Sequence, residues 1–252
     1  MQTKDERRNR AKHVKSIALS MMDEKAIHPA VLLGVPTHLT QKNSLPAIEF
    51  VSSFSQNAAF DVPGSTVGVL IFCSYRKPGG GWENGAKAQE EDVSLASTWA
   101  VQAAASDPGF YEANDGMGAD QVLLAQGYWL YDLNGVPLSP PVSVSFGGIA
   151  APNRQVEAVR QKSSVELIDV LAKRLTGMFN AWHDAGIQTV VSGAIGCGVF
   201  EWEGEDSAES LKQALGATRW KGRLILAMPD PKLEQAFKSV LLPAQMSSKL
   251  KL

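Results

Sequence analysis

Residues 67–81 read VGVLIFCSYRKPGGG and join a nearly continuous apolar run to a turn of three glycines. The run, Val67 to Cys73, is rich in Val, Ile and Phe, a pattern typical of a strand buried on both faces of a parallel sheet. We therefore predict a buried strand whose carboxyl end leads into a glycine-rich loop. In α/β folds, ligands bind beyond this end of the strands.

Strands and helices are predicted to alternate along the rest of the chain. The other predicted strands are Ala47–Ser52, Val142–Phe146, Ile187–Val191 and Arg223–Met228. The predicted helices are Asp5–Glu24, Gln89–Ser106, a helix opened by a Ser163–Glu166 capping box and ended by Gly186, Ser207–Leu215 and Pro231–Leu241. Phe110–Pro141 is expected to be an irregular binding loop, and Pro243–Leu252 a frayed tail. This order predicts an α/β sheet with helices on both faces.

Composition excludes several classes of protein. The 252 residues carry a net charge of -2 and are 44% hydrophobic, which is ordinary for a globular protein and argues against disorder. A charge so near zero gives no global attraction to nucleic acid or anionic lipid. Apolar runs are too short to span a membrane, and Met1–Lys15 lacks the apolar core of a secretory signal. We expect one cytoplasmic domain over residues 1–252, with no membrane or obligate protein partner.

No cofactor or metal site is predicted. Two cysteines imply no disulfide framework, and four scattered histidines have no metal-ligand spacing. A second glycine-rich turn, Gly193–Gly198, reads GAIGCG, which is not the Rossmann fingerprint, and no Walker motif occurs. NAD and ATP sites are therefore disfavoured. Each glycine cluster is either a plain tight turn or a nest of backbone N–H groups for a diphosphate.

Three consecutive carboxylates follow the first glycine turn. Gln89-Glu90-Glu91-Asp92 begins a predicted helix, where acidic side chains stabilise the positive end of the helix dipole. In a dry site these carboxylates could not all ionise freely, so one would have a raised pKa, as a general acid requires. An acid beside a diphosphate cradle suits cleavage of a ribosyl bond.

The stretch 78–92, PGGGWENGAKAQEED, resembles the GGG-x7-QEE signature of bacterial-type poly(ADP-ribose) glycohydrolases, which are macrodomains. Further matches follow in the family's order: Phe110-Tyr111-Glu112, Ala151-Pro152-Asn153 and GAIGCGVF at 193–200. The resemblance covers about residues 5 to 240. It implies a macrodomain-like, three-layer α/β/α fold with a mixed, largely parallel sheet and an extra N-terminal helix.

The resemblance also implies roles for the matched residues. Glu91 would protonate the departing oxygen at the distal ribose and then deprotonate the attacking water, Glu90 would hydrogen-bond ribose hydroxyls or the leaving sugar, and Gln89 would fix the loop. The other implied substrate-binding residues are Gly79, Gly80, Gly81, Asn153, Gly196, Cys197, Gly198, Val199 and Phe200. The implied enzyme releases ADP-ribose from poly- or mono-ADP-ribosylated macromolecules, either protein or nucleic acid.

Several features leave alternatives open. Ser74–Pro78 replaces a smaller family segment, so Tyr75, Arg76 and Lys77 could change the surroundings of the distal ribose or form a solvated turn. An aromatic among Tyr128, Trp129 and Tyr131 could stack on adenine or pack in its own loop. The basic residues Arg7, Arg8, Arg10, Lys12 and Lys15 form either a nucleic-acid patch or a solvated helix face. The main alternative to the hydrolase is a non-catalytic ADP-ribose reader.

Overall fold

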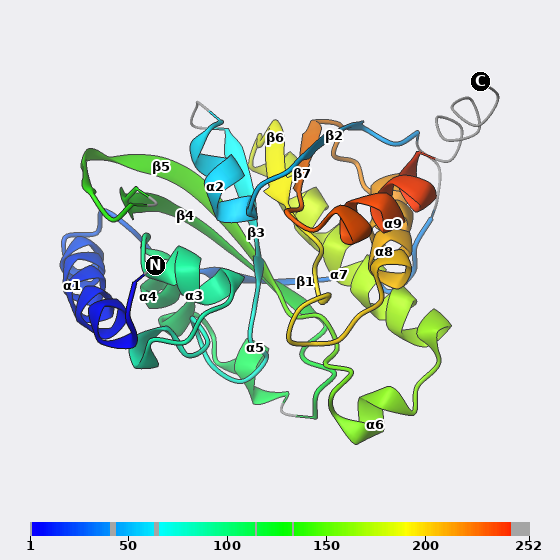
Figure 1. The fold of residues 1–252 in the computed structure, drawn as a ribbon, viewed down its shortest axis with the longest axis horizontal. Coiled ribbons are helices and arrows are strands. Elements are labelled where there is room, and N and C mark those ends of the chain that lie inside the picture. Colours follow the sequence, from blue (N-terminus) through cyan, green and yellow to red (C-terminus); the bar gives the residue numbers. More distant parts are fainter. Residues whose placement is uncertain (1, 41–43, 63–65, 114, 133, 243–252) are drawn as a thin grey trace.

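The computed structural model describes residues 2–40, 44–62, 66–113, 115–132 and 134–242. Within them, seven strands form one sheet in the order β1-β4-β5-β3-β6-β7-β2 (Figure 1). Their bounds are β1 (Val31–Gly34), β2 (Ala47–Val51), β3 (Val67–Phe72), β4 (Gln121–Tyr131), β5 (Pro137–Ile149), β6 (Thr189–Ser192) and β7 (Arg223–Ala227). The pairings from β5 across to β2 are parallel, and β4 is antiparallel to both β5 and β1. The predicted mixed, largely parallel sheet is confirmed.

Helices cover both faces of this sheet. In the described ranges they are α1 (Lys4–Asp23), α2 (Ser55–Phe60), the short 3-10 helix η1 (Trp82–Asn84), α3 (Gln89–Ser94), α4 (Trp99–Ala104), α5 (Gly109–Glu112), α6 (Glu157–Arg160), α7 (Ser164–Asp184), α8 (Gly204–Ala217) and α9 (Pro231–Leu241). No helix in the part of the chain that the structure describes is long and apolar enough to cross a bilayer.

Strand β3 shows why the fold has three layers. Val69 and Ile71 pack into the core shared with α1, α3 and α4, whereas Leu70 packs into the core shared with α7, α8 and α9. Successive side chains of a strand point to opposite faces, so one apolar strand fills both cores. Gly68 faces the second core, where a Cβ would lie 2.8 Å from Trp182 Cε2. The α/β/α layering predicted for the chain is confirmed.

The predicted N-terminal helix is confirmed as α1, but its basic residues are not all on a solvated face. α1 lies at the end of the sheet opposite α8 and α9 (Figure 1). Arg7 is buried and forms an ion pair with Asp92, and Lys15 forms one with Glu83 on η1. These contacts attach α1 to the segment that carries the three carboxylates.

The prediction of an irregular loop over Phe110–Pro141 was wrong. Most of this region is β4 and the start of β5, which pair with each other in an antiparallel register. Trp129 packs against Phe60 and Phe146, with ring centroids 4.8 and 5.4 Å apart, so it is a core residue. The strand prediction Val142–Phe146 covered only the inner part of β5.

The single helix predicted over Gln89–Ser106 was also wrong, because it is broken between α3 and α4. Ser97 forms a β-bridge with Trp129, and the N–H of Thr98 donates to Tyr128 O at 3.1 Å. The Ser97 hydroxyl donates to Val93 O, which satisfies a carbonyl at the end of α3.

Ser163 caps α7 by accepting the N–H of Glu166, and Gly186 follows that helix with φ +72. The predicted frayed tail lies outside the described residues.

Candidate active site

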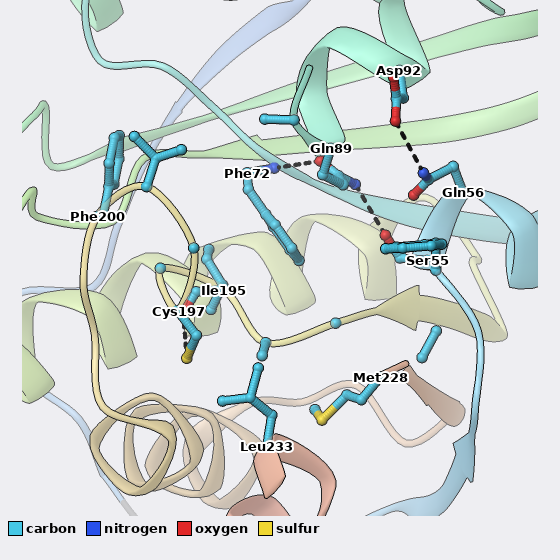
Figure 2. A pocket seen from close by; sticks show the side chains of 18 of the residues that line it. Ser55, Gln56, Phe72, Gln89, Asp92, Ile195, Cys197, Phe200, Met228 and Leu233 are labelled. Atoms are coloured by element: carbon cyan, nitrogen blue, oxygen red, sulfur yellow. Dashed lines mark hydrogen bonds between the residues drawn. The ribbon is translucent and has the colours of Figure 1, made fainter. Parts of the chain in front are cut away.

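A cavity of about 510 Å³ lies beyond the carboxyl ends of β3, β6 and β7 (Figure 2). Its lining comes from the end of β3 and the next residue (Phe72, Cys73), the residues before α3 and α3 itself (Lys87, Ala88, Gln89, Asp92), Ala151 after β5, the turn 193–200, the end of β7 and the segment into α9 (Ala227, Met228, Pro229, Leu233), and the cap and start of α2 (Phe54, Ser55, Gln56). Its size is that of a small-molecule site. Of the predicted site residues, the turn 193–200 and Gln89 line this cavity, as does the neighbouring Asp92. Gly79, Gly80, Gly81, Glu90 and Glu91 are not part of its lining.

The turn Gly193–Phe200 forms one wall of this cavity. Gly196 has φ +80, and a Cβ there would lie 2.6 Å from Trp202 Cδ1, so both backbone strain and packing favour glycine. Among the described residues, no acceptor receives the N–H of Gly198 or Val199. These amides are available to an anion in the cavity. Burial raises the pKa of the Cys197 thiol to about 11, so Cys197 is a neutral thiol near pH 7.

Glu91 lies against the first glycine turn. Its Oε1 accepts the N–H of Gly81 at 2.9 Å, and a Cβ on Gly80 would lie 2.4 Å from that oxygen. Gly79 and Gly80 have φ +69 and +59, which other residues rarely adopt. The turn therefore needs glycine both for its backbone and for its close approach to the carboxylate.

Glu90 is buried beneath the same turn, with 2% of its surface exposed. Its carboxylate accepts the N–H of Ser74 at 2.7 Å, the N–H of Gly79 at 3.1 Å and the indole N–H of Trp99 at 3.3 Å. Burial raises the pKa of Glu90 to about 8, opposed by the Ser74 N–H and reinforced by the charge of Glu91. By accepting the N–H groups of Ser74 and Gly79, Glu90 holds both ends of the loop 74–79 in place. Its contact with ribose hydroxyls stays a prediction.

Gln89 holds the end of β3 in place. Its Oε1 accepts the N–H of Phe72 at 3.0 Å, and its Nε2 donates to the Ser55 hydroxyl at 3.3 Å (Figure 2). Its Nε2 also donates to Leu70 O at 2.8 Å. The pairing of β3 with β6 ends at Val69. Beyond that residue, the side chain of Gln89 takes the place of β6 and hydrogen-bonds the backbone of β3 at Leu70 and Phe72. The loop-fixing role expected of Gln89 agrees with this geometry.

Asn153 and Phe200 come together through Tyr75. Asn153 Nδ2 donates to the Tyr75 hydroxyl at 3.5 Å, and the rings of Tyr75 and Phe200 lie 5.8 Å apart. Phe200 lines the cavity, whereas Asn153 and Tyr75 do not. Tyr75 is 3% exposed, so this unusual residue of the 74–78 segment is a core residue and not part of a solvated turn.

The sequence did not indicate which residues line the far end of the cavity, or which residue supports α3. Phe54 to Gln56 follow β2, and Ala227 to Pro229 end β7, so the rule that located the glycine turns could also have located these segments. Arg7 had no sequence signal: it donates to Asp92 at 2.6 Å and to Ala86 O at 2.5 Å from 79 or more residues away.

In the described ranges, no group of three or more His, Cys, Asp or Glu residues is placed to hold a metal ion.

The family model of the microbial-type PARG catalytic domain, where PARG is poly(ADP-ribose) glycohydrolase, matches residues 4–134. This range is slightly more than half of the chain and holds both the glycine turn and the three carboxylates. The chain belongs to this family. As a microbial-type PARG it is a glycohydrolase that acts on ADP-ribose linkages.

Solved structures agree with this membership. PARG from Thermomonospora curvata is similar to this chain with a TM-score of 0.71 at 22% identity, over 90% of this chain and 97% of that one. PARG from Deinococcus radiodurans, in a complex with ADP-ribose, is similar with a TM-score of 0.66 at 26% identity, over 79% and 85% of the two chains. No curated protein matches the sequence significantly.

Proposed function

We propose that this PARG releases ADP-ribose by hydrolysing the glycosidic bond at the anomeric carbon of the terminal ribose, with Glu91 as its acid and base. The observation that carries the proposal is the position of α3. Gln89 and Asp92, on either side of the glutamate pair, line the same cavity as the turn 193–200. A sugar that reaches Glu91 can therefore keep its diphosphate at that turn.

The backbone of the turn would hold the diphosphate. The N–H groups of Gly196, Gly198 and Val199 supply fixed dipoles, which stabilise an anion without reorganising during the reaction. The N–H of Cys197, which was also expected to bind the diphosphate, instead donates to Ala194 O at 3.3 Å. Held there, the substrate presents its anomeric carbon to Glu91, and orientation of this kind lowers the barrier. Phe200, with Tyr75 packed against it, would cover the terminal ribose from the side of the turn.

Glu91 would perform both proton transfers. In the first step its carboxylic acid gives a proton to the departing glycosidic oxygen as the bond to the anomeric carbon breaks, leaving an oxocarbenium-like sugar. In the second step the carboxylate takes a proton from the water that attacks this carbon, which restores the acid and yields free ADP-ribose. The Gly81 N–H keeps the carboxylate pointed at the turn throughout.

Turnover and binding measured on the same variant test this proposal. Glu91→Gln should lower the rate of ADP-ribose release by roughly 10²–10⁴-fold, the usual contribution of a general acid or base. ADP-ribose binding, measured by calorimetry, should remain near the wild-type value. Tight binding by the wild type without any release would instead identify an ADP-ribose reader, and a Glu91→Gln enzyme with normal turnover would exclude the role given to Glu91.

A further inference from the structure

Two carbonyl groups of the turn 193–200 are held by residues that do not line the cavity. Ile195 O accepts the hydroxyl of Ser207 on α8 at 2.8 Å, and Gly198 O accepts the N–H of Glu201 at 3.1 Å. Ile195 and Gly198 line the cavity, whereas Ser207 and Glu201 do not. The turn is therefore fixed by hydrogen bonds from outside the cavity, which none of the roles proposed above uses.

These two bonds set the direction of the N–H groups that follow. In a planar trans peptide, the C=O of one residue and the N–H of the next point in opposite directions. The N–H of Gly196 is thus directed away from Ser207, and the N–H of Val199 away from the backbone of Glu201. Both Gly196 and Val199 line the cavity, and within the described residues neither N–H meets an acceptor. Both are therefore available to a ligand in the cavity.

Cys197, in the same turn, shows the contrast. Its N–H donates to Ala194 O at 3.3 Å and is already used. Its thiol approaches Ile195 O at 3.8 Å, but a thiol is a weak donor. The Ser207 hydroxyl is therefore the stronger of the two side-chain donors to this carbonyl.

The burial of Ser207 makes its bond resist a change in the turn. Ser207 is fully buried, so its hydroxyl needs a partner inside the protein. If the peptide between Ile195 and Gly196 rotated, the hydroxyl and the carbonyl would both lose their partner, and buried unpaired polar groups are costly. The hydrogen bond thus favours the one orientation in which the Gly196 N–H stays unpaired within the turn.

We infer that Ser207 is a positioning residue for the diphosphate of the substrate: by holding Ile195 O, it keeps the N–H of Gly196 directed at the phosphate oxygens. The inference rests on the proposed function, which assigns the diphosphate to this turn. It gives a role in substrate affinity to one hydroxyl that does not line the cavity. Glu201 acts on Val199 through its backbone, so Ser207 is the position that a side-chain substitution can test.

Binding and turnover of Ser207→Ala test the inference, with Ser210→Ala as the matched control. Ser210 is also fully buried on α8, but its hydroxyl donates to Asp206 O at 2.9 Å within the helix. Ser207→Ala should weaken ADP-ribose binding, measured by calorimetry, roughly tenfold, as expected for a hydrogen bond to a charged group. KM for poly(ADP-ribose) should rise by a similar factor with kcat near the wild-type value, because the diphosphate is held alike in ground and transition states. Ser210→Ala should change neither.

The amide resonances of the wild type provide a test that needs no variant. In a proton–nitrogen NMR titration with ADP-ribose, a hydrogen bond to the diphosphate should move the Gly196 N–H proton downfield. The Cys197 N–H, already bonded to Ala194 O, should change much less. The Gly196 shift should be smaller in Ser207→Ala and unaltered in Ser210→Ala.

Three results would overturn the role of Ser207: unchanged affinity in Ser207→Ala, an equal loss in Ser210→Ala, or a Gly196 resonance that ADP-ribose does not move. If Ser207→Ala does not fold, the titration of the wild type decides. Failure of the proposed function is distinct. A wild type that shows the Gly196 shift and binds ADP-ribose, but releases none from the polymer, would contradict hydrolysis and leave the role of Ser207 in binding intact.

Discussion

Replacing Gly80 by alanine would move the proposed catalytic carboxylate without removing it. A Cβ at this position would lie 2.4 Å from Glu91 Oε1, whereas ordinary contacts begin at 3.4 Å. The carboxylate, the turn or both must therefore shift by about 1 Å in total. A misplacement of about 1 Å can cost about 10²-fold in rate, so Gly80→Ala should lower kcat by about that factor.

The substitution also carries a cost that has nothing to do with catalysis. Gly80 has φ +59, and an L-residue in this region costs about 1–2 kcal/mol of stability. Gly186→Ala separates the two effects, because Gly186 has φ +72 and no atom within 4 Å of its ideal Cβ position. Both variants should lose a similar free energy of unfolding, and only Gly80→Ala should lose turnover.

The assay combines urea denaturation with the release of ADP-ribose from the polymer. We expect near-equal shifts of the unfolding midpoint for the two variants and a large difference in kcat. If Gly80→Ala turns over as fast as Gly186→Ala at equal stability, the position of the Glu91 carboxylate does not control the rate. The close packing of the glycine turn would then serve the fold alone.

Three further predictions concern the side chains of Arg7, Glu90 and Cys197. Arg7→Ala should lower stability by roughly 1–2 kcal/mol in thermal or urea unfolding, because it removes the ion pair with Asp92 and the hydrogen bond to Ala86 O. The exposed Arg8→Ala should have little effect, and similar losses in the two variants would contradict the support assigned to Arg7. Glu90 has a folded pKa of about 8 against an ordinary 4.5, so the folded state binds the proton more tightly; its stabilisation is complete below pH 4.5 and is lost as the pH rises towards 8. The slope reaches at most about 1.4 kcal/mol per pH unit, and Glu90→Gln, measured by unfolding across that range, should remove it; an unchanged slope would refute the assignment. Cys197, whose pKa is raised to about 11, should react slowly with iodoacetamide at neutral pH in the folded protein, and fast alkylation would contradict the raised pKa.

The sequence predicted the elements whose signals are local. The apolar run of β3, the cap of α7 at Ser163 and the periodicity of α1 each depend on neighbouring residues, and each prediction was confirmed. The position of the turn 193–200 at the cavity beyond the strand ends also follows from parallel strand order. These features need no knowledge of tertiary packing.

Strand β4 and the two ends of β5 were missed, the first because the Gly, Asn, Asp and Pro residues of Phe110–Pro141 were interpreted as a loop. In the structure the glycines of these strands admit neighbouring side chains. A Cβ on Gly127 would lie 2.4 Å from Gln102 Oε1, and one on Gly147 would lie 2.3 Å from Trp182 Cζ2. Such close approaches involve residues distant in sequence, so no local pattern distinguishes them from a turn.

The different surroundings of Glu90 and Glu91 could not be predicted either. Crowding indicated that one of the carboxylates would have a raised pKa, but burial selects Glu90, which the loop 74–79 and Trp99 enclose. Glu91, the next residue, is left at the edge of the glycine turn. Which of two adjacent acids is enclosed depends on a loop whose path the sequence does not specify.

A crystal structure of Glu91→Gln with bound ADP-ribose tests the central claim most directly. We expect the diphosphate to lie against the amides of Gly196, Gly198 and Val199, and the residue 91 side chain to lie within hydrogen-bond distance of the anomeric hydroxyl. A diphosphate bound elsewhere, or an anomeric carbon that faces away from residue 91, would contradict the proposed mechanism.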